Sequence, residues 1–213
     1  MNIPRSLFNE ISQQLQESNK VLVIYGARQV GKTTLVESLL KTLTLKALKI
    51  NADEERFSDV LSSRDSRKLL ELTEGYELLF IDEAQRVPDI GINLKILTDT
   101  RKDLKIIATG SSSFELANKV AEPLTGRKRT FILYPIAHLE LKSLFNNYEL
   151  KGSVEERLIW GSYPEIFRLK GRDTKISYLR ELSTDYLYKD ILELEELRYP
   201  AKIRDLLKLL AYQ

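Results

Sequence analysis

The residues with the clearest chemistry lie in the stretch GARQVGKT, residues 26–33. Gly26 and Gly31 permit backbone angles and close approaches that a side chain would block. Successive N–H groups of such a turn point at one bound anion, and a helix that follows adds the positive end of its dipole. Lys32 has a charge suited to the β- and γ-phosphates of a nucleotide, and Thr33 has a hydroxyl suited to Mg²⁺. The spacing therefore predicts a loop that binds ATP with Mg²⁺.

The candidate nucleotide-binding residues form one continuous set. They are Gly26, Ala27, Arg28, Gln29, Val30, Gly31, Lys32, Thr33 and Thr34. The apolar run VLVIYG, residues 21–26, is typical of a strand buried on both faces, and it delivers the chain to the loop. For Arg28 two interpretations stay open, a contact with phosphate and simple exposure to solvent.

An acidic pair ends another apolar run, LLFIDEAQ at residues 78–85. Asp82 is the candidate that holds Mg²⁺ through its water shell. Glu83 is the candidate catalytic base that orients and polarises the attacking water. A Glu directly after the Asp favours hydrolysis over group transfer. The alternative, a strand that leads into a solvated turn, is much less favoured beside the loop described above.

Polar residues follow a fourth apolar run, in the stretch ATGSSS at residues 108–113. Thr109 and Ser111 are candidates for sensing the γ-phosphate or positioning water, and an ordinary cap of the next helix is the alternative. The stretch LTGRKRT, residues 124–130, contains Arg127, Lys128 and Arg129. An arginine here is a candidate finger that stabilises transition-state charge in a neighbouring subunit. A solvated basic turn is the alternative for Arg127.

Apolar runs alternate with helical spacing over the first two thirds of the chain. Candidate strands lie at residues 21–26, 46–51, 77–82, 104–110 and 130–135. Candidate helices lie at residues 3–18, 31–43, 66–73 and 89–101. This β–α alternation predicts an α/β fold with a doubly wound parallel sheet.

The pattern changes near Pro135, after which no convincing strand occurs. We expect a P-loop domain at residues 1–136 and a helical lid region with the start of a further domain at residues 137–213. Helices are expected at residues 137–149, 153–160, 174–196 and 200–213. The last stretch, IRDLLKLLAYQ, has helical spacing without a capping signal, so we expect a truncated chain.

Composition excludes several classes of protein. The 213 residues include 33 Lys and Arg against 31 Asp and Glu, and a net charge of +2 gives no sign of nucleic-acid binding by itself. The absence of cysteine excludes disulfides, thiolate zinc sites and cysteine nucleophiles, and it fits the cytoplasm. No run approaches ~18 apolar residues, so we expect no membrane association.

The motifs together resemble a known group, the prokaryotic ATPases of the AAA superfamily that join an N-terminal ATPase domain to a C-terminal domain of unassigned, winged-helix-containing function. The matching pieces are GARQVGKTTL, FIDEAQRVPDI, IIATGSSS, LTGR, GSYPE and YLYKDI, between residues 24 and 191. The resemblance implies a five-stranded sheet in the order 5-1-4-3-2. It also implies that Thr109 or Ser111 faces the γ-phosphate and that LTGR supplies the finger Arg127.

These observations favour a Mg²⁺-dependent ATP hydrolase that acts as a switch or motor. The alternatives are a regulatory or DNA-associated module that binds ATP with little turnover and, less favoured because of DEAQ, a small-molecule kinase. A GTPase would have D-x-x-G and N-K-x-D, whereas EAQ follows Asp82, and Val-Ala follows Asn118 and Lys119. Expected partners are a second copy of the chain, and DNA or a protein bound through the missing C-terminal part.

Overall fold

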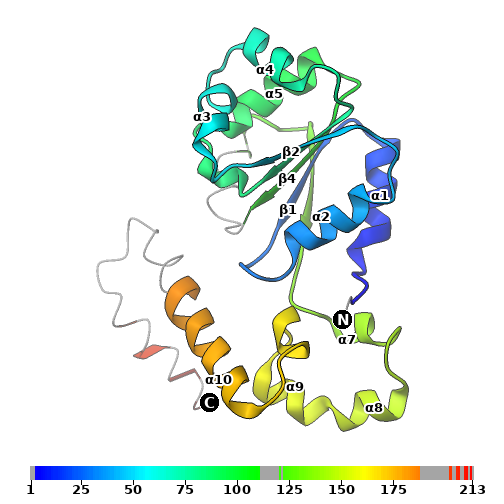
Figure 1. Ribbon diagram of the computed structural model, residues 1–213, viewed down its shortest axis with the longest axis vertical. Coiled ribbons are helices and arrows are strands. Elements are labelled where there is room, and N and C mark those ends of the chain that lie inside the picture. The colour runs from blue at the N-terminus through cyan, green and yellow to red at the C-terminus, as the bar shows by residue number, and fades with distance from the viewer. Residues whose placement is uncertain are drawn as a thin grey trace.

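The computed structural model describes residues 3–110, 120 and 122–187, with positions 202, 205, 206, 209, 210 and 212. The described part forms a parallel sheet with helices on both faces, followed by a group of short helices (Figure 1). None of the described helices is both long and apolar enough to cross a membrane.

The sheet consists of five parallel strands in the order β2-β3-β4-β1-β5. Their bounds are β1 Val21–Tyr25, β2 Ala47–Asn51, β3 Leu78–Asp82, β4 Lys105–Gly110 and β5 Lys128–Ile132. The predicted fold class and strand order are confirmed. Strand β4 therefore lies between β1, which leads to the loop, and β3, which ends in the acidic pair.

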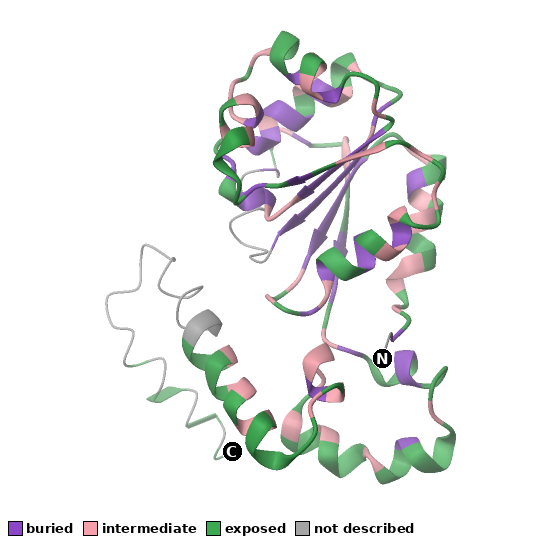
Figure 2. Cartoon of the chain, in the orientation of Figure 1, coloured by how far each residue is buried: buried purple, intermediate pink, exposed green. Residues whose placement is uncertain are grey.

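The central strands are apolar throughout because both of their faces are covered. All five residues of β1 are buried, whereas β5 at the edge has only Phe131 buried. Charged and polar residues are tolerated on an edge strand because one of its sides meets solvent. Figure 2 shows the central strands as the most continuously buried part of the molecule.

Alternate residues of β1 supply the two halves of the core. Leu22 and Ile24 pack with α1 (Leu7–Glu17) and α2 (Lys32–Leu40) on one face. Val21, Val23 and Tyr25 belong to the core of the opposite face. That face is covered by α3 (Glu55–Leu61), α4 (Ser66–Thr73) and α5 (Ile90–Thr100). Figure 1 shows α1 and α2 on the side of the sheet opposite to α3, α4 and α5.

The second region contains short helices with a small core of its own. Its elements are α7 (His138–Leu141), α8 (Asn147–Gly152), α9 (Val154–Trp160), the 3-10 helix η2 (Pro164–Phe167), α10 (Arg172–Glu181) and the π-helical turn η3 (Leu182–Leu187). Ile136, Leu141 and Leu150 pack there against Ile3 from the N-terminal segment. The N-terminal segment consequently joins the sheet region to α7, beside which Figure 1 shows it.

Three local expectations differ from the structure. The helix expected at 137–149 is interrupted, because Asn146 caps a new helix through hydrogen bonds from the N–H groups of Tyr148 and Glu149 at 2.9 and 3.0 Å. The fifth strand begins at Lys128, earlier than its apolar residues indicated, because β5 is an edge strand. Helix α3 was not predicted. The helices expected at 174–196 and 200–213 extend outside the described residues.

Candidate functional site

Strand β1 and helix α2 position the predicted loop at the carboxyl edge of the sheet. A Cβ atom on Gly26 would lie 2.3 Å from the carbonyl oxygen of Leu133, so only glycine fits where the two segments approach each other. The N–H of Leu133 donates to the carbonyl of Tyr25 at 2.7 Å and fixes that approach.

Two loop residues have left-handed backbone angles, Gln29 with φ of 62° and Gly31 with φ of 94°. Alternation of such angles curls a short segment and turns successive N–H groups to one side, which forms a concave anion site. Val30 between them is fully buried in the core beneath α1 and α2, and this anchors the loop to the sheet.

The side chain of Lys32 lies inside this loop. Lys32 is only 5% exposed, and its ammonium donates to the carbonyl oxygens of Gly26 and Ala27 at 2.9 and 3.1 Å. Charged phosphate oxygens are stronger acceptors for an ammonium than neutral carbonyls are. The loop therefore holds one buried positive charge where a phosphate would be bound.

Asp82 is the point at which three segments meet. Its Oδ2 accepts a hydrogen bond from the Thr33 hydroxyl at 2.7 Å, and its Oδ1 accepts from the Thr109 hydroxyl. The backbone N–H of Glu83 also donates to Oδ1, at 3.2 Å. A hydroxyl and a carboxylate oxygen side by side are ligands that suit Mg²⁺, which takes the rest of its shell from phosphates and water. Thr33 and Asp82 thus fit the predicted metal site.

Glu83 is held next to this site by a residue that sequence reasoning did not assign. Its Oε2 accepts a hydrogen bond of 2.5 Å from the amide nitrogen of Gln85, a residue only 2% exposed. Glu83 also has a left-handed φ of 52°. The motif DEAQ contained Gln85, but nothing in the sequence indicated that its side chain turns back toward Glu83.

A cavity of about 850 Å³ opens beside the loop. Lys32, Thr33 and Glu83 line one part of it, and apolar residues line the rest, from the N-terminal segment, the end of the sheet and η2. The apolar lining residues include Ile3, Pro4, Phe8, Ile136, Pro164 and Phe167. Its size lies in the range of small-molecule sites.

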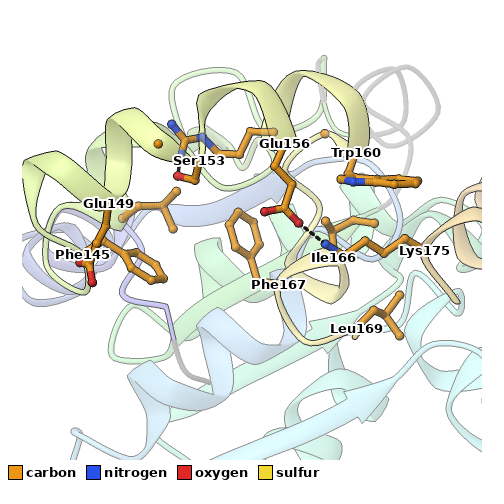
Figure 3. Close-up of a pocket in the computed structure, with 13 residues that line it drawn as sticks. Phe145, Glu149, Ser153, Glu156, Trp160, Ile166, Phe167, Leu169 and Lys175 are labelled. Atoms are coloured by element: carbon orange, nitrogen blue, oxygen red, sulfur yellow. Dashed lines mark hydrogen bonds and ion pairs between the residues drawn. The ribbon is translucent and has the colours of Figure 1, made fainter. Parts of the chain in front are cut away.

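A second cavity, of about 480 Å³, lies within the helical region (Figure 3). Phe145, Trp160 and Phe167 line it, and Lys175 forms an ion pair of 2.6 Å with Glu156 at its rim. Carboxylates (Glu149 and Glu156) and cations (Arg157 and Lys175) both line this cavity.

The other residues that the sequence predicted for the site do not all lie beside the loop. Thr109 is fully buried against Asp82, and Ser111 lies outside the described residues. Arg28 is partly exposed in the loop. Arg127 precedes β5 at the opposite edge of the sheet, where its Nε donates to Asp99 at 2.8 Å. The five-residue length of β5 separates the two edges by about 16 Å, so the structure does not bring Arg127 to the loop of its own chain.

Arg5 and Glu140 form a buried ion pair beside the loop, and sequence reasoning did not identify either residue. Arg5 lies in a stretch noted only for its helical spacing, and Glu140 lies in a helix of the second region. No local motif could have indicated that residues so distant in sequence meet.

Comparison with known proteins adds an independent finding. A family model described as an AAA domain matches residues 18–142, and a model of a domain of unknown function matches residues 151–213. The chain is 27% identical over 90% of its length to the uncharacterized protein MJ1544 of Methanocaldococcus jannaschii. It is 29% identical over 85% of its length to the uncharacterized protein Rv2008c of Mycobacterium tuberculosis. The chain spans 46% and 38% of those two proteins.

Among solved structures, the Walker-type ATPase PABY2304 of Pyrococcus abyssi resembles the chain with a TM-score of 0.57. The match covers 99% of this chain and 76% of that protein, at 19% identity. At this identity the likeness shows a shared fold.

Proposed function

This chain belongs to the AAA domain family, and from that premise we propose that it binds ATP with Mg²⁺ and hydrolyses it to ADP and phosphate. One observation carries the proposal: the buried Lys32 lines one cavity with Thr33 and Glu83, and the Thr33 hydroxyl donates a hydrogen bond to Asp82. Together they provide phosphate charge compensation, metal ligands and a base, which are the parts that phosphoryl transfer to water requires.

The chemistry of the proposed reaction assigns a role to each of these groups. A water oxygen bonds to the γ-phosphorus while the bond from that phosphorus to the bridging oxygen breaks and ADP leaves. Glu83 accepts the proton that the water loses. Lys32 compensates charge on the β- and γ-phosphate oxygens. Bound Mg²⁺ supplies further charge neutralisation, and Thr33 and Asp82 would hold it.

The residues around the acidic pair have supporting roles in this proposal. Gln85 orients the carboxylate of Glu83 through its 2.5 Å hydrogen bond, and Thr109 orients Asp82. Ser111 stays the candidate that senses the γ-phosphate. The apolar wall of the cavity would contact the base, because the flat faces of an aromatic base can pack against apolar side chains.

We further propose that hydrolysis drives a switch or motor in an assembly of several copies in the cytoplasm. Arg127 supports this, because it lies at the edge of the sheet remote from its own loop and could act on a neighbour. DNA or a protein is the proposed partner of the longer protein. The regulatory module that binds ATP with little turnover stays the alternative, and a small-molecule kinase is less favoured.

Phosphate release from ATP and Mg²⁺, measured in the burst and in the steady state with and without DNA, tests the proposal. Sustained release supports an ATP hydrolase, and stimulation by DNA supports a DNA-linked motor. A single burst without turnover supports the regulatory module. Failure to bind a labelled ATP analogue would overturn the proposal altogether.

A further inference from the structure

Arg5 lies beside the phosphate-binding loop and lines the same cavity, and its guanidinium joins three parts of the chain. Nη1 donates to the carbonyl oxygen of Val30 in the loop at 2.7 Å. Nη2 donates to the carbonyl oxygen of Tyr134 after β5 at 2.5 Å, and Nε donates to Oε1 of Glu140 in α7 at 3.2 Å. The Arg5 side chain is only 9% exposed. A rigid, planar fork of donors can satisfy three acceptors at once, which a single ammonium cannot do in the same geometry.

Glu140 anchors this guanidinium on the helical region. Its side chain is 4% exposed, and it accepts hydrogen bonds from the N–H groups of Ser6 and Ala137 at 2.8 and 2.9 Å. Burial by itself raises the pKa of Glu140, but the N–H groups of Ala137 and Ser6 and the charge of Arg5 lower it below its ordinary value of 4.5. Glu140 is thus ionised at neutral pH and fixes Arg5 in place.

The contact with Val30 determines the direction of the next N–H group. The described peptide bonds are all trans, and in a planar trans peptide the C=O and the following N–H point in opposite directions. Because the carbonyl of Val30 points at Arg5, the N–H of Gly31 points away from it. The N–H groups of a phosphate-binding loop converge on the bound anion, so the orientation of this peptide decides whether the Gly31 N–H can contribute.

We propose that Arg5 is a positioning residue for nucleotide binding, which holds the Val30–Gly31 peptide so that the Gly31 N–H donates to a phosphate. Through Glu140 the same side chain ties this peptide to α7. A displacement of α7 that withdraws Glu140 would loosen the peptide, so the helical region and nucleotide affinity are coupled. The proposal rests on ATP binding at this loop and extends that site to a residue of the N-terminal segment that lines the same cavity.

The chain offers a matched control in Arg101, which lies before β4 at the opposite edge of the sheet. Its guanidinium donates to the carbonyl oxygens of Thr73 and Tyr76 at 3.0 Å each and pairs with Asp103 at 2.6 Å. Arg101 is 20% exposed. Both arginines therefore join two backbone carbonyls and one carboxylate, but only Arg5 contacts the loop.

The test compares the wild type, Arg5→Ala and Arg101→Ala. Displacement of a fluorescent ATP analogue by ATP and by ADP with Mg²⁺ gives the two affinities. The melting temperature without nucleotide measures any loss of stability. Arg5→Ala is expected to weaken ATP and ADP equally, by about tenfold, the value of one misdirected hydrogen bond. Arg101→Ala is expected to lower the melting temperature without changing either affinity.

Unchanged affinities of Arg5→Ala would overturn the proposal, and so would an equal loss of affinity in Arg101→Ala. If Arg5→Ala does not fold, Arg5→Lys decides, because it keeps a charge near Glu140 but cannot also hold the Val30 carbonyl. A wild-type affinity of Arg5→Lys overturns the proposal, and a loss of affinity with a preserved melting temperature supports it. Absence of ATP binding by the wild type would instead refute the proposed function, and this proposal with it.

Discussion

The sheet region and the helical region differ sharply in how their side chains are packed (Figure 2). Every residue of β1 is buried, whereas α9 and α10 contribute no buried residue. In α9 the apolar side chains of Leu158 and Ile159 are 82% and 62% exposed. The sheet region has a core on each face, and the described part of the helical region has only a small cluster around Leu141 and Leu150.

The densely packed sheet region and the weakly packed helical region contribute different kinds of residue to the proposed site. The side chains proposed to act on phosphate, water and metal extend from the ends of strands β3 and β4 or from the first turn of α2, which follows the loop. The described residues of the helical region that line the cavity include Pro164, Phe167 and Arg168. Residues that carry out chemistry must be held within a fraction of an ångström, which requires densely packed support. Residues that only contact a ligand along the side of a cavity can belong to a weakly packed segment.

The largest effect is expected for Lys32→Ala, which removes the buried charge from the part of the cavity that the sheet region lines. Loss of charge-assisted hydrogen bonds to two phosphates should weaken ATP binding by ~10³-fold or more. Titration of a labelled ATP analogue measures it, with Lys41→Ala, an exposed lysine just after α2, as the control. Unchanged affinity of Lys32→Ala would refute the loop assignment.

Arg127→Ala tests whether the sheet region also acts through its opposite edge. In an assembly it should lower hydrolysis by ~10³-fold with little change in ATP binding, because an arginine supplied by a neighbour stabilises charge on the γ-phosphate. Inactive Glu83→Gln subunits, which retain Arg127, are then mixed with Arg127→Ala subunits, and turnover is measured. Partial recovery supports action between subunits. No recovery despite demonstrated co-assembly would leave Arg127 as a residue that acts within its own chain or has a structural role.

Glu83→Gln tests whether ATP hydrolysis can be lost while ATP binding is kept. The amide has nearly the shape of the carboxylate but cannot accept a proton, so turnover should fall by ~10²-fold or more while ATP affinity is kept. Steady-state phosphate release and analogue titration on the same preparation measure the two quantities. Turnover at the wild-type rate would show that Glu83 is not the catalytic base.

The smallest effect on activity is expected for two leucine substitutions that compare the stability of the sheet region with that of the helical region. Leu79→Ala, at a fully buried position of β3, should cost about 2–5 kcal/mol in the free energy of unfolding, through lost burial and a cavity. Leu158→Ala in exposed α9 should cost less than ~0.5 kcal/mol. Urea unfolding of both variants gives the comparison. Equal losses would mean that α9 is packed as tightly as the sheet.

Features encoded by consecutive residues were predictable from the sequence. The loop, the acidic pair and the parallel sheet depend on local spacing and on apolar runs, because a strand buried on both faces has to be apolar throughout. The strand order, implied by family resemblance, is confirmed. The break before Asn146 was not predicted, because a cap inside an apolar pattern is a weaker signal than the pattern itself.

Contacts between distant residues were decided only by the tertiary structure. Arg5 and Glu140 are 135 positions apart, and Thr109 is 27 positions from Asp82. Charged and hydroxyl side chains occur throughout this sequence, and their type does not indicate which of them become buried together. Burial removes competing water and obliges each polar group to find a partner inside the protein. The sequence therefore determined which residues could do the chemistry, and the packing of the N-terminal segment, the sheet and α7 decided which residues hold them in place.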